Sequence, residues 1–211
     1  MDKKFWGPPT WNIIHIVAAA YEPSYKYSMI SFLHSLPELL PCDNCKENLL
    51  AEYKKLPFGA DCFKDNRNMF LWTFLLHNNV NNKLKKPTPK YALSEKYFFE
   101  NCKNPKYWGP FFWKVIHSFA ASYRPAAKES FVNFINSLPG IIPCVQCKKK
   151  LNELLANVPL TDEYLLDNNR LFLWSFIFHD MVNKGLKKTS PPFEMVKAIY
   201  FDEKICKKCG L

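Results

Sequence analysis

Pro41-Cys42-Asp43-Asn44-Cys45 and Pro143-Cys144-Val145-Gln146-Cys147 are two copies of one motif, 102 positions apart. Many other residues repeat at the same offset, without any insertion or deletion. They include Trp6 and Trp108, Trp11 and Trp113, His15 and His117, Trp72 and Trp174, His77 and His179, Asn81 and Asn183, and Lys86 and Lys188. A repeat of about a hundred residues is too long for a solenoid unit and suits a small domain. We therefore predict two tandem domains, residues 1–101 and residues 102–211.

The composition of the 211 residues narrows the class of protein. The net charge of +10 comes almost entirely from lysine, because only Arg67, Arg124 and Arg170 are arginines. The lysines are dispersed, whereas modules that read nucleic acids depend on arginine and stacked aromatic residues in recognisable motifs. We therefore interpret the charge as a solvated basic surface and expect no nucleic-acid partner.

Neither a signal peptide nor a membrane span is visible in the sequence. The first residues run directly into the motif at Trp6-Gly7-Pro8, and no apolar run of about eighteen residues follows. We expect a cytoplasmic protein without a membrane anchor. Thiols in the cytoplasm are kept reduced, so eight cysteines there point to redox chemistry or metal binding instead of structural bridges.

Six of the eight cysteines form Cys-x-x-Cys pairs, the third being Cys206-Lys207-Lys208-Cys209. At a helix N-terminus, backbone N–H groups and the helix dipole lower a cysteine pKa and favour the reactive thiolate. Zinc sites usually place two cysteine pairs roughly 12 to 20 residues apart, which the duplicated pairs do not match, and thioredoxin-like dithiols require a βαβ context. A four-cysteine zinc site formed between the two copies stays open as an alternative.

Prolines and helical periodicity divide each copy into four helices and a short fifth one. Alternating strand patterns are essentially missing. In the first copy, the expected helices run from Pro8 to Glu22, over 26–36, from Pro41 onward, over 66–84 and over 94–99. Cys42 and Cys45 then lie in the first turn of the third helix. We predict an all-α fold of two tandem four-helix bundles, each with a short fifth helix, joined near residues 101–105.

Two helices of each copy carry tryptophan and histidine side chains toward the inside. His15 follows Trp11 by four residues, and Asn81 follows His77 by four, so each pair shares one helix face. One such histidine would usually be a core residue with a hydrogen-bond partner, but a duplicated set beside a cysteine pair indicates a lodged aromatic cofactor. The pattern has too few carboxylates for a di-iron site, and we expect no metal. A flavin fits, and cations for its pyrophosphate follow at Lys83, Lys85 and Lys86.

Together these residues resemble the Erv/ALR family of FAD-dependent sulfhydryl oxidases. The first copy carries the pattern Trp6-Gly7-Pro8-x-x-Trp11-x-x-x-His15-x-x-Ala18-x-x-Tyr21-x-Pro23, then Pro41-Cys42-x-x-Cys45, then His77-Asn78-x-Val80-Asn81-x-x-Leu84-x-Lys86-Pro87. The second copy repeats it with Trp108-Gly109-Pro110, Trp113, His117, Tyr123, Pro125, Cys144, Cys147, His179, Val182, Asn183, Leu186 and Lys188. The motifs span nearly the whole chain, and their combination is highly specific.

The resemblance implies a flavin-linked thiol oxidase that makes disulfide bonds in protein substrates. Electrons would pass through the Cys-x-x-Cys pairs to FAD, one per domain, and then to O2, which gives H2O2. The second cysteine, Cys45 or Cys147, would face the flavin, and the first, Cys42 or Cys144, would exchange with incoming disulfides. FAD contacts are implied for Gly7, Trp11, His15, Tyr21, His77, Asn78, Asn81, Lys83, Lys86, Trp113, His117, Tyr123, His179, Asn183 and Lys188.

The resemblance also implies partners and a place of action. Reduced protein thiols, or a carrier of the thioredoxin or glutaredoxin kind, would donate the electrons. Family members are commonly homodimers, so we expect the two copies to pack as a pseudo-dimer within one chain, with a homo-oligomer as a further arrangement. The terminal pair Cys206 and Cys209 would act as a shuttle; the alternatives are a frayed tail or a metal-binding stub. The resemblance implies either the mitochondrial intermembrane space or the factories of large cytoplasmic DNA viruses. Because no targeting segment is visible, we favour a virus factory or a virion.

Three positions of the second copy depart from the pattern of the first, namely Asp180, Gly185 and Thr189. An acid near the cofactor is unfavourable, so FAD is expected less firmly in the second copy. Cys62 and Cys102 have no cysteine counterparts in the second copy and are either free or paired with each other. A structural cysteine pair that many family members carry is absent here. Its positions hold Phe74, Tyr91, Phe176 and Phe193.

The rival hypothesis is a non-catalytic duplicated helical scaffold with zinc or degenerate flavin sites. The cysteine pairs and the cofactor residues are largely intact in both copies, which argues against it. Bound flavin is yellow and zinc is colourless, so a visible absorption spectrum separates the two hypotheses.

Overall fold

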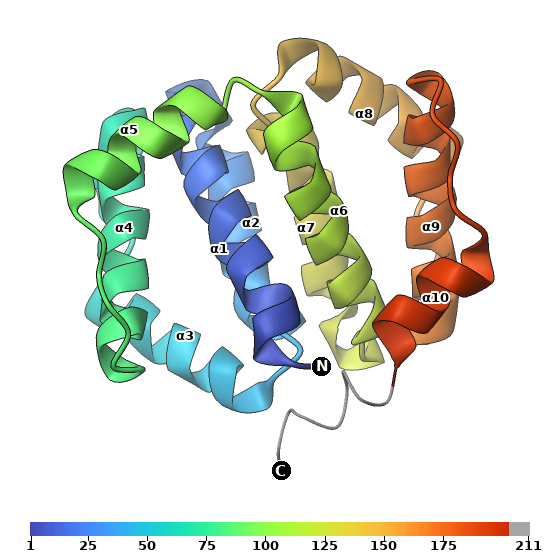
Figure 1. Cartoon of the computed structure of the whole chain (residues 1–211), viewed down its shortest axis with the longest axis horizontal. Coiled ribbons are helices and arrows are strands. Elements are labelled where there is room, and N and C mark those ends of the chain that lie inside the picture. Colours follow the sequence, from blue (N-terminus) through green and yellow to red (C-terminus); the bar gives the residue numbers. More distant parts are fainter. Residues whose placement is uncertain (203–211) are drawn as a thin grey trace.

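A computed structural model describes residues 1–202, so Cys206 and Cys209, the expected shuttle, lie outside the described residues. Residues 1–202 form ten α-helices and three short 3-10 helices, without a strand (Figure 1). This confirms the all-α prediction. No helix in this part of the chain is long and apolar enough to cross a membrane.

The first copy contains α1 to α5, and the second copy contains α6 to α10. The first five helices are α1 Lys3–Ala19, α2 Lys26–Leu39, α3 Asp43–Lys55, α4 Asn66–Lys83 and α5 Tyr91–Asn101. The next five are α6 Pro105–Ala121, α7 Lys128–Ile141, α8 Val145–Asn157, α9 Asn168–Gly185 and α10 Phe193–Phe201. The 3-10 helices are Pro23–Tyr25, Ala60–Phe63 and Pro125–Ala127. In each copy the fifth helix packs on the first, so the predicted bundle of four helices plus a short fifth is confirmed.

Prolines mark the helix ends less sharply than the sequence predicts. The first helix begins before Pro8, because the Asp2 side chain accepts a hydrogen bond from Lys4 N at 2.9 Å and caps it. Pro8 therefore lies inside α1, and Pro37 lies inside α2 instead of ending it. Both helices are largely buried, and this packing offsets the hydrogen bonds that the prolines cannot make.

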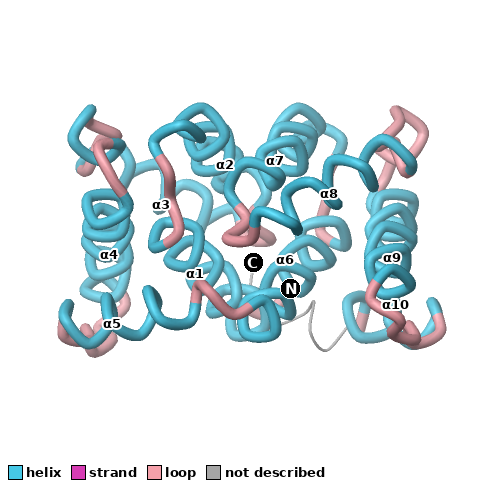
Figure 2. Tube along the Cα trace, turned by 90° about the horizontal axis from the view of Figure 1, so that it is seen from above, coloured by secondary structure: helices cyan, strands magenta, loops and turns pink. Residues whose placement is uncertain are grey.

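The two copies meet along α2 and α7 and along α1 and α6, at the centre of the molecule (Figures 1 and 2). Phe32 and Phe134, which are equivalent residues of the two copies, face each other with ring centroids 5.9 Å apart. Ser31 Oγ donates a hydrogen bond to the backbone oxygen of its own equivalent, Asn133, at 3.3 Å. Contacts between equivalent residues place a local two-fold axis between α2 and α7. The expected pseudo-dimer within one chain is therefore present.

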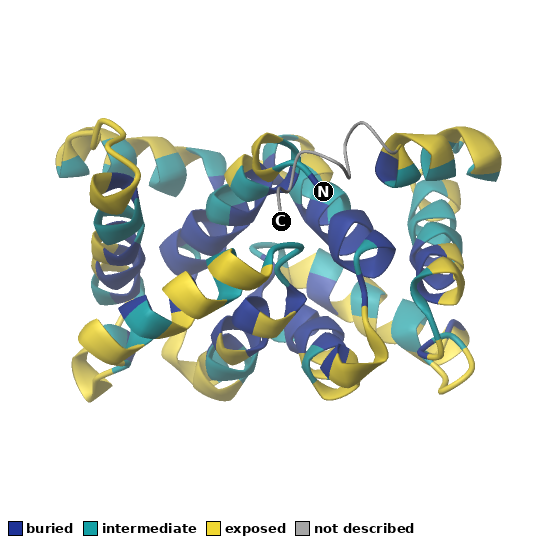
Figure 3. Ribbon diagram, turned by 90° about the horizontal axis from the view of Figure 1, so that it is seen from below, coloured by how far each residue is buried: buried dark blue, intermediate teal, exposed yellow. Residues whose placement is uncertain are grey.

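The buried residues concentrate on this central junction. In Figure 3 the dark blue segments lie mainly along α1, α2, α6 and α7, while the outer faces are exposed. Phe32 and Phe134 are completely buried. A domain of about a hundred residues hides only about two-thirds of its surface by itself. Docking α2 on α7 therefore gives each copy a larger core than it would have alone.

Aromatic pairs join α4 to α5 and α9 to α10. Phe74 meets Tyr91 edge-on with ring centroids 5.1 Å apart, and Phe176 meets Phe193 in the same way at 5.2 Å. These are the positions at which the sequence lacks the structural cysteine pair of the family. The edge-on geometry contributes about 0.5–1.5 kcal/mol per pair beyond the buried area. Both copies thus hold the fifth helix without a covalent bridge at this point.

Cys62 and Cys102 are free thiols, so the pairing between them that the sequence left open is not formed. Cys102 is buried and Cys62 is partly buried. Burial raises the pKa of both thiols, which keeps them protonated and less reactive.

Candidate active site

Each cysteine pair lies at the N-terminus of a helix. Cys42 caps α3, its sulfur accepts a hydrogen bond from Cys45 N at 3.3 Å, and the two cysteines form a disulfide. Cys144 and Cys147 repeat this arrangement at the start of α8, with a hydrogen bond of 3.2 Å. The first cysteine is therefore the N-cap and not part of the first turn. The positive end of the helix dipole favours the thiolate that forms when the disulfide is reduced.

A tryptophan and a histidine from two different helices stack in each copy. Trp11 on α1 lies flat on His77 of α4, with ring centroids 4.0 Å apart and the planes 3° from parallel. Trp113 on α6 and His179 of α9 do the same at 3.9 Å and 6°. The duplicated sequence pattern thus becomes two nearly identical aromatic platforms, of the kind that a flat ring system can use.

Hydrogen bonds fix the tautomers of the two histidines in the first copy. The Thr73 hydroxyl donates to Phe70 O at 2.9 Å, so it accepts from His15 Nδ1 at 3.1 Å. His15 Nε2 is then an acceptor, and His77 Nδ1 donates to it at 2.9 Å. In its neutral form His77 consequently presents Nε2 as a hydrogen-bond acceptor.

The second copy builds the same relay with serine in place of threonine. The Ser175 hydroxyl donates to Phe172 O at 2.7 Å and accepts from His117 Nδ1 at 2.9 Å. His117 Nε2 accepts from His179 Nδ1 at 2.9 Å. Neither Thr73 nor its equivalent Ser175 is among the site residues that the sequence predicts. The available signal was a hydroxyl residue four positions before the histidine of α4 and α9.

Burial keeps these histidines neutral. Burial and the neighbouring His77 lower the pKa of His15 to about 3, and burial and the Lys86 charge lower the pKa of His77 to about 4. In the second copy the corresponding pKa values are about 3 for His117 and about 4 for His179. At neutral pH the relay therefore carries no charge and ends in an acceptor.

The lysines at the end of α4 have two different roles. Lys86 lies close enough to His77 for its charge to lower the pKa of that histidine. The residue before it, Lys85, has a left-handed backbone conformation with φ 52°. Lys83, by contrast, forms an ion pair of 2.5 Å with the carboxylate of Glu52, which is buried on α3. Lys83 thus binds the protein's own carboxylate. The second copy replaces this pair by Leu154 and Gly185.

Asp180, which departs from the family pattern, is neutralised within the second copy. Its carboxylate forms an ion pair of 2.7 Å with Lys184. Hydrogen bonds from Lys184 and Ser190 lower its pKa, so it stays ionised but paired. Ser190 also accepts from the Asn183 side chain at 2.9 Å. The acid therefore belongs to a closed polar network and does not add an unpaired charge to the site.

The remaining expected cofactor residues divide into two groups. Tyr21 and Tyr123 are buried, and their hydroxyls donate to Phe63 O at 3.2 Å and Leu165 O at 3.0 Å, so they hold the loop before α4 and before α9. Gly7 on α1 has open space where a Cβ would stand. Asn78 and Asn81 lie on the same helix as His77, where Asn78 is partly buried and Asn81 is buried. Among all the expected residues, the rings that contact one another within each copy are Trp11, His15 and His77, and Trp113, His117 and His179.

Residues 1–202 contain no group of three or more histidine, cysteine, aspartate or glutamate side chains placed to hold a metal ion. The two cysteine pairs belong to opposite bundles and each is closed as a disulfide. A flavin is a better match to the donor set, because the platforms offer aromatic planes, a neutral acceptor, an open backbone approach at Gly7 and a cation at Lys86.

Two separate stretches of the chain, residues 8–102 and residues 110–203, match the model of the Erv1/Alr family. The chain belongs to the Erv1/Alr family. The two matched stretches include both cysteine pairs and both aromatic platforms. No solved structure is significantly similar to the chain.

Several viral proteins are similar to this Erv1/Alr chain. A protein named FAD-linked sulfhydryl oxidase from African swine fever virus is 36% identical over 103 residues, which are 44% of this chain and 80% of that protein. A protein of Invertebrate iridescent virus 3 is 35% identical over 89 residues, 40% of this chain and 60% of that protein. A protein of Acanthamoeba polyphaga mimivirus is 31% identical over 102 residues, 46% of this chain and 71% of that protein. The last two also carry FAD-linked sulfhydryl oxidase in their names, and each match covers less than half of this chain.

Proposed function

We propose that the chain is a FAD-linked sulfhydryl oxidase that makes disulfide bonds in protein substrates. The observation that carries this proposal is that each Erv1/Alr bundle contains both a helix-capping Cys-x-x-Cys disulfide and a Trp–His platform. The proposed repeat units are residues 1–101 and residues 102–211.

The thiol chemistry follows from the geometry of the cysteine pairs. A substrate thiolate attacks Cys42 or Cys144, and the second cysteine leaves as a thiolate stabilised by the helix N-terminus. A second substrate thiol then displaces the first cysteine, so the substrate leaves as a disulfide and the pair is left as a dithiol. When bound, FAD would supply the two-electron acceptor for this dithiol, with O2 as the final acceptor and H2O2 as the product. Cys45 and Cys147 are the cysteines that face the flavin in this proposal.

The residues that would hold FAD are the platform and its surroundings. Trp11 and His77 would offer the flavin flat surfaces and an acceptor at His77 Nε2. The open space beside Gly7 would admit the cofactor, and Lys86 would supply the charge for its pyrophosphate. The second copy has the same platform, and its Asp180 is paired with Lys184. These likenesses support one FAD in each copy.

Two further parts of this proposed function are the electron donors and the place in the cell where the chain acts. The donors are reduced protein thiols or a thioredoxin- or glutaredoxin-like carrier, and Cys206 with Cys209 relays their electrons. Viral relatives support a role in the cytoplasm of an infected cell, at a virus factory or in the virion.

The test is a visible absorption spectrum together with oxygen consumption. The purified chain should carry two flavins and consume O2 when dithiothreitol is added. Cys45→Ser and Cys147→Ser in separate chains should each remove the contribution of one copy, and both together should abolish activity while the flavin stays bound. A colourless protein that consumes no O2 with dithiothreitol contradicts the proposal and favours the scaffold.

A further inference from the structure

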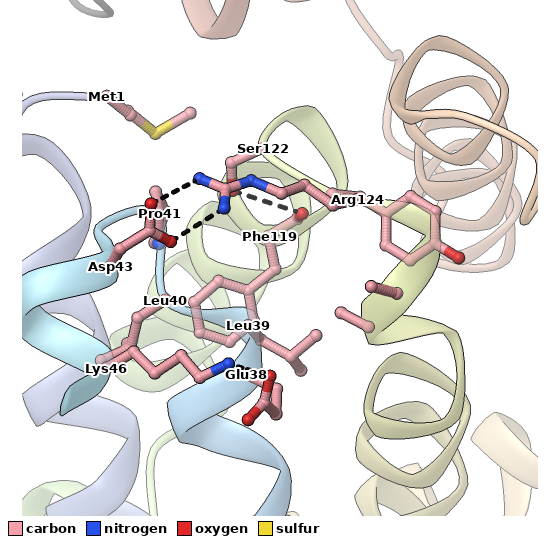
Figure 4. A pocket seen from close by; sticks show the side chains of 13 residues that line it. Met1, Glu38, Leu39, Leu40, Pro41, Asp43, Lys46, Phe119, Ser122 and Arg124 are labelled. Atoms are coloured by element: carbon pink, nitrogen blue, oxygen red, sulfur yellow. Dashed lines mark hydrogen bonds and ion pairs between the residues drawn. The ribbon is translucent and has the colours of Figure 1, made fainter. Parts of the chain in front are cut away.

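A pocket opens at the junction of the two copies, beside the cysteine pair of the first one (Figure 4). Its volume is about 790 Å³ including its open mouth. The first copy supplies the end of α2 and the turn into α3, including Pro41 and Asp43 on either side of Cys42. The second copy supplies the end of α6 and the turn that follows it, including Arg124 and Ala127. The pocket therefore reaches the residues that flank the redox cysteine.

Paired charges border this pocket. Figure 4 shows the Arg124 guanidinium forked on the Asp43 carboxylate, with hydrogen bonds of 2.8 and 3.1 Å. Lys46 and Glu38 form a second ion pair of 2.5 Å below it. The four charged side chains that line the pocket are therefore paired with one another, and Leu39, Leu40 and Phe119 add apolar surface to the lining.

The corresponding place beside the cysteine pair of the second copy is filled. Ala127 lines the open pocket, and its equivalent in the first copy is Tyr25. Lys148 Nζ lies 3.6 Å from the centroid of the Tyr25 ring. The same ring lies so close to Gly140 that an added Cβ there would stand 3.3 Å from it. Lys148 and Gly140 are the equivalents of two residues of the open pocket, Lys46 and Glu38.

In the second copy, Tyr25 thus contacts both the lysine and the glycine that stand at the positions of Lys46 and Glu38 in the open pocket. The Lys148 side chain is 11% exposed, compared with 35% for Lys46, because the tyrosine of the other copy covers it. An added Cβ at Gly140 would clash with the Ser28 side chain and would stand 3.3 Å from the Tyr25 ring, whereas the first copy has a glutamate at the equivalent position. A side chain of the protein therefore occupies, beside Cys144, the place that is open beside Cys42.

We propose that the pocket beside Cys42 binds the peptide segment that flanks an incoming dithiol, and that Tyr25 takes the place of this segment beside Cys144. Peptide dithiols then react with the first copy, whereas a small dithiol reaches both pairs. This assignment rests on the proposed oxidase activity and adds which of the two pairs receives a peptide substrate.

The chemistry of disulfide exchange explains why a peptide would use this pocket. The substrate thiolate attacks Cys42 and Cys45 leaves, then the second substrate thiol displaces Cys42. The substrate loses two electrons and becomes a disulfide, the pair gains them as a dithiol, and the two thiol protons pass to it. During the mixed disulfide the neighbours of the substrate cysteine lie beside Pro41 and Asp43, which line the pocket. Dithiothreitol has no such neighbours.

The test exchanges the two residues between the copies. One chain carries Cys144→Ser and Cys147→Ser, so that only the first pair works, and is compared with and without Ala127→Tyr. The other carries Cys42→Ser and Cys45→Ser and is compared with and without Tyr25→Ala. All chains also carry Cys206→Ser and Cys209→Ser. The added substrates are a reduced synthetic peptide of residues 200–211, which contains Cys-Lys-Lys-Cys, and dithiothreitol as the reference.

The measured quantity is the ratio of kcat/KM for the peptide to kcat/KM for dithiothreitol, followed by O2 consumption. Filling or opening a pocket for a side chain is worth about tenfold or more in discrimination. We therefore expect Ala127→Tyr to lower the ratio about tenfold and Tyr25→Ala to raise it by a similar factor. Ratios that stay the same in both comparisons overturn the assignment. Failure of both starting chains to oxidise dithiothreitol would instead contradict the oxidase activity itself.

Two further measurements keep the test informative. Ala127→Tyr combined with Glu38→Gly reproduces the pair of residues that the second copy carries, so a packing defect in the single variant is relieved. Circular dichroism checks the fold of each chain. In chains that keep Cys206 and Cys209, reduced ribonuclease distinguishes the sources of the dithiol. If Ala127→Tyr slows ribonuclease oxidation only in these chains, the occupant is the terminal segment; if it also does so without them, the ribonuclease segment docks itself.

Discussion

Glu22 and Arg124 stand at the same position in the two copies, carry opposite charges, and each forms an ion pair with the redox helix of the other copy. Arg124 binds Asp43 on α3 at 2.8 Å, and Glu22 binds Lys148 on α8 at 3.4 Å. Two first copies facing each other would bring Glu22 toward Lys46, the equivalent of Lys148, but also toward Asp43. Two second copies would bring Arg124 toward Lys148 and toward the uncharged Val145, the equivalent of Asp43. The charges therefore favour the pairing of unlike copies that a single chain supplies.

The first prediction concerns this charge arrangement. Arg124→Glu should lower the free energy of unfolding, because it places a second acid beside Asp43. The effect should be small, since both side chains are exposed and screened by water. Adding Asp43→Arg to the same chain should recover the loss. Urea unfolding of the wild type, both single variants and the double variant measures the coupling, and a double variant no better than the sum of its singles contradicts it.

The second prediction concerns the hydroxyl that sets the histidine tautomers. Thr73→Val leaves His15 Nδ1–H buried without an acceptor, which should cost about 1–3 kcal/mol in the free energy of unfolding. Thr73→Ser is the matched control, because the second copy has Ser175 at this position, and it should cost much less. Urea unfolding gives the energies. Nitrogen-15 NMR of the imidazoles should show the tautomer of His77 altered in Thr73→Val and kept in Thr73→Ser.

The third prediction concerns acid stability. The folded pKa values of His15 and His77, about 3 and about 4, lie below the ordinary value of 6.5, so the unfolded chain binds protons first as the pH falls. Stability should be complete above pH 6.5 and should decline below it, until the folded histidines also titrate near pH 4 and pH 3. Each histidine contributes a slope of up to about 1.4 kcal/mol per pH unit.

Urea unfolding between pH 7.5 and pH 4.5 measures this decline. The carboxylates also affect stability in this pH range, but they are the same in every variant. His77→Gln together with His179→Gln should flatten the slope, because two of the buried titrating groups are removed. His34→Gln changes an exposed histidine outside both relays and serves as the control. An equal slope in all three proteins would show that the relays do not set the acid sensitivity.

The fourth prediction concerns the aromatic pairs that hold the fifth helices. Phe74 is 7% exposed and meets Tyr91 edge-on, so Phe74→Ala should cost about 3–5 kcal/mol in the free energy of unfolding. Leu93→Ala on the same helix as Tyr91 changes a residue that is 66% exposed and should have little effect. Limited proteolysis should cut the α4–α5 connection faster in Phe74→Ala, and equal rates would mean that the pair does not hold α5.

The sequence by itself determined the repeat, the all-helical class and the composition of the site. Spacings of four residues place Trp11 with His15 and His77 with Asn81 whatever the rest of the chain does, because one helical turn fixes them. The constant offset of 102 residues then assigned to each of these residues its equivalent in the other copy. The prediction that a helix starts at Pro8 was wrong. The Asp2 cap and the burial of α1 outweigh the backbone hydrogen bond that Pro8 cannot make.

Only the tertiary structure decided how the site is completed and how the copies differ. Thr73 lies 58 positions from the histidine that it orients, and no local pattern joins them. Tyr25 meets Lys148 only because α2 packs on α7, which brings the turn of one copy against the redox helix of the other. Helical periodicity predicts which face of a helix is buried. It does not predict which side chain of the other bundle fills the space beside a cysteine.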